Sequence, residues 1–104
     1  MTKQRPEKLQ SRELLERVRQ VVESGDYLDT RHAEERRSQR GISRLEMESV
    51  LTTGRHEKAK DQFQEAYEAW NYAIRGRTID KRDLRVVVSF EEKMLVITAI
   101  EIGK

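Results

Sequence analysis

The hydrophobic pattern of this chain changes its period once, and that change limits the folds open to it. In residues 11–54 apolar side chains recur every three or four positions, as on one face of a helix. In residues 70–102 they recur at every second position, as in a strand with one buried face. Helices followed by adjacent strands form separate layers. The sequence therefore predicts an α+β fold, with the N-terminal helices packed on one face of a C-terminal antiparallel β-sheet.

Capping residues mark the ends of three expected helices. The second helix should end at Gln39 or Arg40, and the third begins with the S-x-x-E pattern of Ser43 and Glu46, a capping box. The expected N-caps are Ser11, Thr30 and Ser43, and the expected helix stops are Gly25, Gly41 and Gly54. Residues 26–30, between the first two helices, fit either a brief strand or a turn.

Three strands are expected in the C-terminal third, at residues 70–75, 84–90 and 94–102. The last of them is the most apolar, and we expect it at the centre of the sheet. Its two expected faces are Met94, Val96, Thr98 and Ile100 on one side and Leu95, Ile97 and Ala99 on the other. Residues 55–69 stay ambiguous, because they combine good helix propensity with little apolar periodicity.

Length and composition restrict the class of protein. The chain has 104 residues, no cysteine and one proline, which suits one hydrophobic core. We expect a single domain over residues 11–104, preceded by a flexible arm over residues 1–10. No apolar run is long enough for a membrane span, and the first residues lack a secretory signal, so we expect a cytoplasmic protein. With no cysteine and two isolated histidines, neither a metal site nor a cofactor is expected.

One stripe of side chains on the second helix could carry chemistry. The net charge is only +2, yet five arginines lie within fourteen residues that contain only two acids: Arg31, Arg36, Arg37, Arg40 and Arg44. His32, Arg36 and Arg40 follow at intervals of four, so their side chains share one helix face. Guanidinium groups bind phosphate, and an imidazole can exchange a proton near neutral pH. The alternative is an ordinary solvated face with helical ion pairs.

The expected strands add a second set of basic candidates. Arg75 and Arg85 lie opposite the apolar rows of their strands, and with Lys81 they would form a positive surface for RNA. Trp70 and Tyr72 could stack on bases, but their alternation with polar residues favours the core. The other histidine, His56, belongs to no motif, and an exposed loop position is the simpler interpretation.

Several short segments resemble the family named domain of unknown function 4258, over roughly residues 28–101. The matching segments are the histidine-alanine pair at 32–33, Arg36, the Arg-Gly-Ile-Ser turn at 40–43, Trp70, Tyr72, Gly76, Ile97 and Thr98. The resemblance implies a compact α+β domain similar to RelE and MqsR toxins, which are often encoded beside an antitoxin with a zinc finger. Toxins of that kind are metal-independent endoribonucleases.

By this analogy the chain would cleave messenger RNA, with His32 as general base or acid and with Arg36 and Arg40 at the scissile phosphate. Arg85 would then contact the substrate backbone. A second hypothesis is a non-catalytic module that binds RNA or an acidic protein through the same basic helix face. A third is a structural domain whose arginines are simply solvated.

Overall fold

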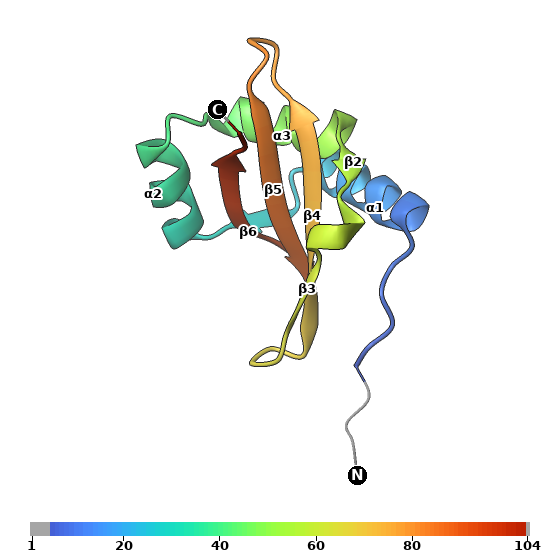
Figure 1. The fold of residues 1–104 in the computed structure, drawn as a ribbon. Helices are drawn as coiled ribbons and strands as arrows, with labels where there is room; N and C mark the ends of the chain where they lie inside the picture. The colour runs from blue at the N-terminus through green and yellow to red at the C-terminus, as the bar shows by residue number, and fades with distance from the viewer. Residues whose placement is uncertain (1–4, 104) are drawn as a thin grey trace.

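The structure is a computed structural model that describes residues 5–103, and it has the predicted α+β architecture (Figure 1). Three helices precede most of a six-stranded sheet. The elements in chain order are α1 (Ser11–Ser24), β1 (Tyr27–Asp29), α2 (Arg31–Gln39), α3 (Arg44–Thr53), β2 (Arg55–His56), the 3₁₀ turn η1 (Lys58–Lys60), β3 (Gln62–Gln64), β4 (Ala69–Arg77), β5 (Asp83–Phe90) and β6 (Met94–Glu101). No helix of the described part of the chain is long and apolar enough to cross a membrane.

The sheet is mixed, and its central strand is β5. The strand order is β1-β6-β5-β4-β2, and β3 also pairs with β4, near the start of that strand. All pairs are antiparallel except β1 with β6, which is parallel. The last strand, β6, lies between β1 and β5, so it is an interior strand as predicted, but the middle strand of the sheet is β5. The short strand β1 pairs along β6, and β2 and β3 pair along β4, which leaves β5 in the middle.

A register shift in the β5–β6 pair explains why strict alternation fails in the last strand. Val88 pairs with Val96 but its neighbour Val87 pairs with Thr98, so Ile97 is an extra residue on β6. Core-facing residues are then Met94, Val96 and Ala99, each at most 2% exposed. The expected faces are correct up to Val96 and reversed after it.

Helices α1 and α3 cover one face of the sheet, whereas α2 lies along the side of β6 (Figure 1). Together they enclose one core with the inward rows of β4, β5 and β6. Its fully buried large side chains include Leu14, Val18, Met47, Val50, Leu51, Ile74, Leu84, Val86 and Val88. Tyr72 and Ile74 are core residues as predicted, and Trp70 is partly buried against the core.

The helix caps agree with the sequence in most places. Thr30 caps α2, Ser43 and Glu46 form the capping box of α3, and Gly25 ends α1 with a left-handed φ of 74°. Ser11 is not a cap. The N-cap of α1 is Gln10, which makes no side-chain capping bond, and the Ser11 hydroxyl contacts a histidine instead.

Gly54 ends α3 for a reason other than a left-handed turn. Its φ is −77°, which any residue adopts. A Cβ at this position would lie 2.5 Å from the carbonyl oxygen of Val50 and 2.6 Å from that of Arg75. Glycine is therefore required because the end of α3 passes directly against the backbone of β4.

The ambiguous segment 55–69 is not a helix. It forms β2, η1 and β3, and both short strands pair with β4. The ring of Phe63 packs edge-on against that of Trp70, with centroids 5.3 Å apart. The free edge of β4 offers backbone partners and aromatic contacts, which outweigh helix propensity.

Residues 5–10 lie against the β3–β4 side of the domain. The carbonyl of Pro6 accepts a hydrogen bond from the indole Nε1 of Trp70 at 2.8 Å, and the amide of Leu9 donates to the Tyr72 hydroxyl at 2.9 Å. The expected flexibility of residues 1–10 stays a prediction, and positions 1–4 lie outside the described residues.

Candidate functional site

The face of the sheet opposite α1 and α3, here called the open face, carries the polar rows of the long strands. On β5, Leu84, Val86 and Val88 point into the core, so the intervening Arg85, Val87 and Ser89 belong to the open face. The partner rows on β4 are Asn71, Ala73 and Arg75, which register opposite them. Within residues 5–103 the helices α1 and α3 pack on the other side of the sheet, so this face is the one that a ligand could approach.

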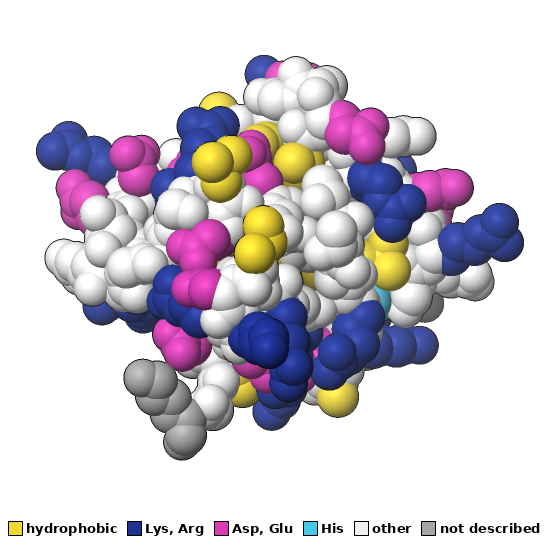
Figure 2. All heavy atoms as spheres, turned by 90° about the horizontal axis from the view of Figure 1, so that it is seen from above, with side chains coloured by type: hydrophobic (Ala, Val, Ile, Leu, Met, Phe, Trp, Pro, Cys, Tyr) yellow, Lys and Arg dark blue, Asp and Glu magenta, His cyan; other side chains and the backbone are white. Residues whose placement is uncertain are grey.

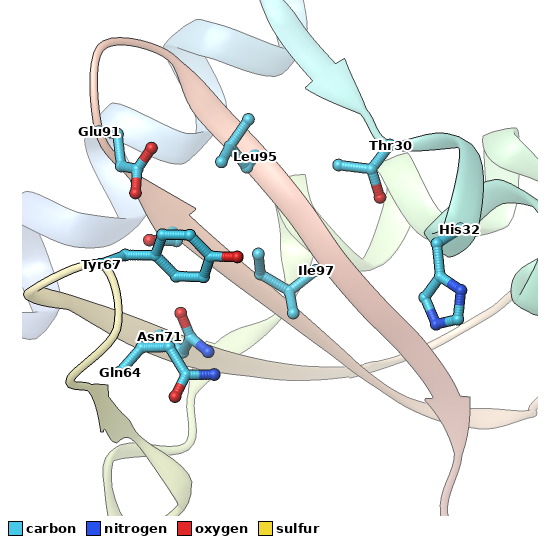
Figure 3. Close-up of a pocket in the computed structure, with 9 residues that line it drawn as sticks. Thr30, His32, Gln64, Tyr67, Asn71, Glu91, Leu95 and Ile97 are labelled. Atoms are coloured by element: carbon cyan, nitrogen blue, oxygen red, sulfur yellow. The ribbon is translucent and has the colours of Figure 1, made fainter.

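A groove of about 340 Å³ lies on the open face between α2 and the β3–β4 hairpin. We call it the His32 groove. It is lined by Thr30, His32, Gln64, Tyr67, Asn71, Ser89, Glu91, Leu95 and Ile97. Figure 3 shows Leu95 and Ile97 on β6 between His32 on one side and Tyr67 and Asn71 on the other. An apolar floor with polar groups on both walls is typical of a ligand-binding site.

Two polar residues of the groove, Asn71 and Ser89, are mostly buried, but the polar atoms of their side chains are not. Asn71 is 9% exposed and Ser89 is 4% exposed. Within the described residues neither side chain has a hydrogen-bond partner. Among the described residues, the buried side-chain polar atoms without a partner are Asp29 Oδ1 and Arg37 Nε, so the amide of Asn71 and the hydroxyl of Ser89 reach the surface of the groove. The amide and the hydroxyl are therefore available to a molecule that occupies the groove.

The predicted stripe on α2 divides into two free side chains and one bound side chain. His32 and Arg36 are exposed, and in the described part of the chain neither side chain has a hydrogen bond or ion pair. Arg40 donates through Nη1 to the Thr98 hydroxyl at 3.2 Å and to the Ala99 carbonyl at 3.0 Å. His32 thus lines the groove, Arg36 follows one turn later, and Arg40 fastens α2 to β6.

The other arginines of the cluster contribute little free charge. Arg37 is buried, and its Nη1 bonds Asp29 Oδ2 at 2.6 Å, with both side chains 8% exposed. Arg31 pairs with Glu35, and Arg44 bonds the hydroxyl of Tyr27 at 3.0 Å. The burial of the phenol, and then its hydrogen bond to Glu48, raise the pKa of Tyr27 to about 12. The basic face expected here is therefore reduced mainly to Arg36.

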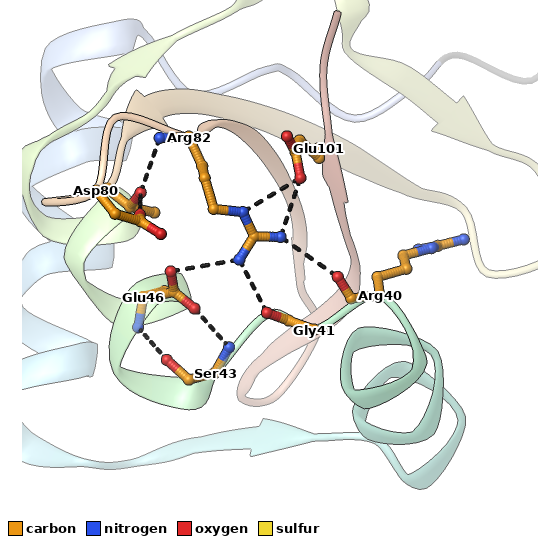
Figure 4. A network of polar contacts seen from close by, with 8 residues as sticks. Arg40, Gly41, Ser43, Glu46, Asp80, Arg82 and Glu101 are labelled. Carbon is orange, nitrogen blue, oxygen red and sulfur yellow. Dashed lines mark hydrogen bonds and ion pairs between the residues drawn. The ribbon is translucent and has the colours of Figure 1, made fainter. Parts of the chain in front are cut away.

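Arg82 holds the end of α2 in place, and sequence reasoning missed it. Its guanidinium donates to the carbonyls of Arg40 and Gly41 at 3.3 and 2.8 Å and pairs with Glu101 at 3.0 Å (Figure 4). It also contacts Glu46 of the capping box at 3.4 Å. One side chain on β4–β5 thus joins α2, α3 and β6, which fixes the helix that carries His32 and Arg36.

Arg75 and Arg85 are neighbours on the open face, as predicted, but both are ion-paired. Arg75 makes a bidentate contact with Asp83, at 2.6 and 3.1 Å, and a 3.0 Å contact with Glu57. Arg85 contacts Glu57 at 2.5 and 3.1 Å. The hydrogen bonds from Arg85, and then those from Arg75, lower the pKa of Glu57 to about 2. Two guanidiniums held by two carboxylates form a balanced network rather than the expected positive surface.

Lys81 is separate from these arginines. It is exposed in the turn between β4 and β5, with a left-handed φ of 68°. Figure 2 shows Lys and Arg side chains gathered most densely along the lower edge of that view, with Asp and Glu beside them. Opposite charges are thus interspersed over the visible face, which agrees with the small net charge of +2.

His56 is buried, so the expectation of an exposed loop histidine is wrong. Its side chain is 2% exposed and lies between the Ser11 hydroxyl, 2.6 Å from Nδ1, and the Asp61 carboxylate, 2.7 Å from Nε2. Asp61 also pairs with Lys8 at 2.7 Å and accepts the amide of Ala73 at 3.0 Å. The ring faces Tyr72 in the core, whereas His32 lines the open face, so the two histidines do not share a site.

The comparisons place the groove within a known sequence family. The model of the family described as domain of unknown function (DUF4258) matches residues 30–101. The chain belongs to this family. The match begins at the cap of α2 and includes every residue that lines the His32 groove. No curated protein and no solved structure matches the chain. In the described residues no group of three or more His, Cys, Asp or Glu could hold a metal ion.

Proposed function

We propose that this protein is a toxin-type endoribonuclease that cleaves single-stranded RNA in the His32 groove by metal-independent acid–base catalysis. The observation that carries the proposal is the groove itself. It combines an unpaired imidazole with the side chains of Asn71 and Ser89, whose polar atoms reach the groove and have no hydrogen-bond partner in the described residues. The unpaired guanidinium of Arg36 follows His32 by one helical turn.

Cleavage requires one proton to be removed and one to be supplied. The ribose 2′-hydroxyl attacks the phosphorus, its proton passes to a base, and the P–O5′ bond breaks as the leaving oxygen gains a proton. His32 is one of the two groups. The other titratable residues of the groove, Glu91 and Tyr67, are candidates for the second. Arg36 stabilises the negative charge that develops on the phosphoryl oxygens. The products are a 2′,3′-cyclic phosphate and a 5′-hydroxyl.

Tyr67 suits the recognition of a single-stranded base. It is 70% exposed at the groove wall, on the loop between β3 and β4. Unstacked bases of single-stranded RNA bind aromatic rings by stacking and offer their edges to side-chain amides. A base on Tyr67 would bring its edge toward Asn71, and duplex RNA could not present a base in this way.

Membership of the RelE and MqsR group of toxins belongs to the same proposal, as does a cognate antitoxin with a zinc finger. Both rest on the resemblance of the sequence. If the protein is such a toxin, its antitoxin would neutralise it by covering the groove or by displacing RNA from it.

The test compares variants of purified protein on a fluorescent single-stranded RNA in the presence of EDTA. We expect His32→Ala to lower the cleavage rate at least 100-fold, since general acid–base catalysis contributes about 10²–10⁴-fold. Arg36→Ala should lower it by a smaller factor. Arg31→Ala is the matched control, because it removes the same charge from the same helix outside the groove. The all-deoxy oligonucleotide should bind without being cut.

A single result separates the proposal from its main alternative. The alternative is a module that binds RNA or an acidic protein without cutting it. The hydrogen bonds of Arg40 to β6 favour this alternative, because they leave one guanidinium, that of Arg36, unpaired near the groove. RNA that is bound by the wild type and recovered intact would refute the nuclease and support the binding module. Equal cleavage by wild type and His32→Ala would remove His32 from the mechanism.

A further inference from the structure

A second cavity, of about 450 Å³, lies at the edge of the sheet where α3 ends, and the open-face residues Arg75 and Arg77 help to line it. We call it the arginine pocket. The residues that line it include three arginines, Asp83 and two glycines, Gly54 and Gly76. The arginines are Arg55, Arg75 and Arg77. No hydrophobic side chain lines this pocket, so its chemistry differs from that of the His32 groove.

The strand register brings the arginines together. Arg55 on β2 registers directly opposite Arg75 on β4, and Arg77 lies two residues further on the same face. Arg77 in turn registers opposite Asp83 on β5. Arg55 and Arg75 carry like charges at directly opposite positions, and such a pair destabilises a sheet unless carboxylates neutralise it.

Only Arg75 is fully compensated. It takes both oxygens of Asp83 and shares Glu57 with Arg85. Arg55 and Arg77 have no hydrogen bond or ion pair with another described residue. The hydrogen bonds from Arg75 are the main cause of the lowered pKa of Asp83, and the charges of Arg77 and Arg55 lower it further, so both lie near the same carboxylate. The pocket therefore holds two guanidiniums with unused donors, where a tetrahedral anion could accept several hydrogen bonds.

We propose that the arginine pocket binds a backbone phosphate of the RNA strand that occupies the His32 groove, with Arg55 and Arg77 as its ligands. This inference rests on the proposed function. Both cavities are lined by residues from the open-face row of β4, with Asn71 in the groove and Arg75 in the pocket. Four residues of strand span about 13 Å. His32 lies beyond β6, two strand spacings or about 10 Å from β4, so the path from His32 to the pocket is at least about 16 Å. A single strand rises about 3.4 Å per stacked nucleotide, so the pocket would meet a phosphate about five or more nucleotides from the scissile one.

The shared face favours RNA over an acidic protein as the occupant. A strand that enters the groove continues along β4 and β5, because the β3–β4 hairpin and α2 bound the groove on its other sides. In the row between the two cavities, Ala73 is fully buried, Val87 is half-buried, and Thr98 accepts a hydrogen bond from Arg40. A strand would therefore cross this row over Val87 and beside the Arg40 guanidinium, whose charge attracts a phosphate backbone.

The test measures binding without cleavage, using 2′-O-methyl oligonucleotides of two and eight nucleotides. The variant is Arg55→Gln with Arg77→Gln, and the matched control is Arg12→Gln with Arg19→Gln on α1, on the opposite side of the sheet. We expect the variant to weaken binding of the eight-nucleotide probe about tenfold and to leave the two-nucleotide probe unchanged. The slope of log affinity against log salt should flatten by about 0.7 for one lost single-strand phosphate contact. The control should not change the affinity for the eight-nucleotide probe relative to the two-nucleotide probe, and it should not change the salt slope.

A second measurement keeps this inference separate from the nuclease proposal. Inorganic phosphate is titrated into the wild type while the Nε–Hε signals of the arginines are followed by NMR. Selective shifts of Arg55 and Arg77 support the pocket even if no RNA is cleaved. Their absence overturns it even if cleavage at His32 is established. Equal weakening of the eight-nucleotide probe in variant and control also overturns it, as does displacement of phosphate by an acidic peptide but not by the eight-nucleotide probe.

Discussion

Glu57 connects the two arginines at the centre of the open face, and its replacement by glutamine gives a pH-dependent prediction. In Glu57→Gln the side chain keeps its shape but loses its charge. Arg75 keeps its bidentate partner Asp83, whereas Arg85 loses the only carboxylate that it contacts among the described residues. The stability cost should therefore come mainly from Arg85, whose side chain is 17% exposed.

The magnitude follows from the pKa of Glu57, which falls from its ordinary 4.5 to about 2 in the folded protein. A depression of this size corresponds to about 3 kcal/mol in favour of the charged form. Solvent still reaches the network, so we expect Glu57→Gln to lower the free energy of unfolding by about 1–2 kcal/mol at pH 7. A depressed pKa stabilises the fold above pH 4.5, and this contribution disappears as the pH falls from 4.5 toward 2.

Urea denaturation at several pH values measures this effect, because urea adds no salt that would screen the charges. The difference in unfolding free energy between wild type and Glu57→Gln should be largest at pH 7 and close to zero near pH 2. Glu16→Gln, at an exposed position of α1, is the matched control and should show no such difference. A difference that is the same at pH 7 and pH 2, or below about 0.5 kcal/mol at pH 7, would refute the assigned role of the network.

Two further predictions concern the packing that positions the site. Asp29→Asn should destabilise the protein by about 3–5 kcal/mol, because it leaves Arg37 charged and buried. In a double-mutant cycle measured by thermal unfolding, Asp29→Asn with Arg37→Met should recover part of that loss. If the costs of the two substitutions simply add, the residues do not form a direct pair. Gly54→Ala should cost about 1–3 kcal/mol or more, because its Cβ would overlap two backbone oxygens, whereas Gly25→Ala, which has open space, should cost only about 1 kcal/mol from its left-handed φ. Equal costs at the two glycines would contradict the close approach of α3 to β4.

Local signals in the sequence were sufficient for the helices and for half of the candidate site. Thr30, Ser43 and Gly25 act within a few residues of their own position, so their roles can be predicted without tertiary information. The four-residue spacing of His32 and Arg36 likewise predicts one helix face, and the structure puts His32 in the groove. No local signal could show that Arg40 binds β6 or that Arg37 faces the core. The sequence around an arginine does not reveal whether its side chain is solvated or paired with a residue from a distant segment.

The rest of the site comes from segments that meet only in the folded chain. Asn71 and Ser89 register opposite each other across β4 and β5, and Tyr67 reaches them from a hairpin whose sequence favours a helix. His56 similarly depends on Ser11, which lies 45 residues away, for the contact that buries it.

By itself, the sequence determined the α+β class, the order of the three helices and the three long strands, and most of the helix ends, because periodicity and capping are short-range properties. Only the tertiary structure decided which strand is central, where β6 changes face, and which arginines are free. These outcomes depend on edge pairing, on one extra residue in the β5–β6 register and on carboxylates from distant segments, and each is a long-range competition that local sequence does not encode.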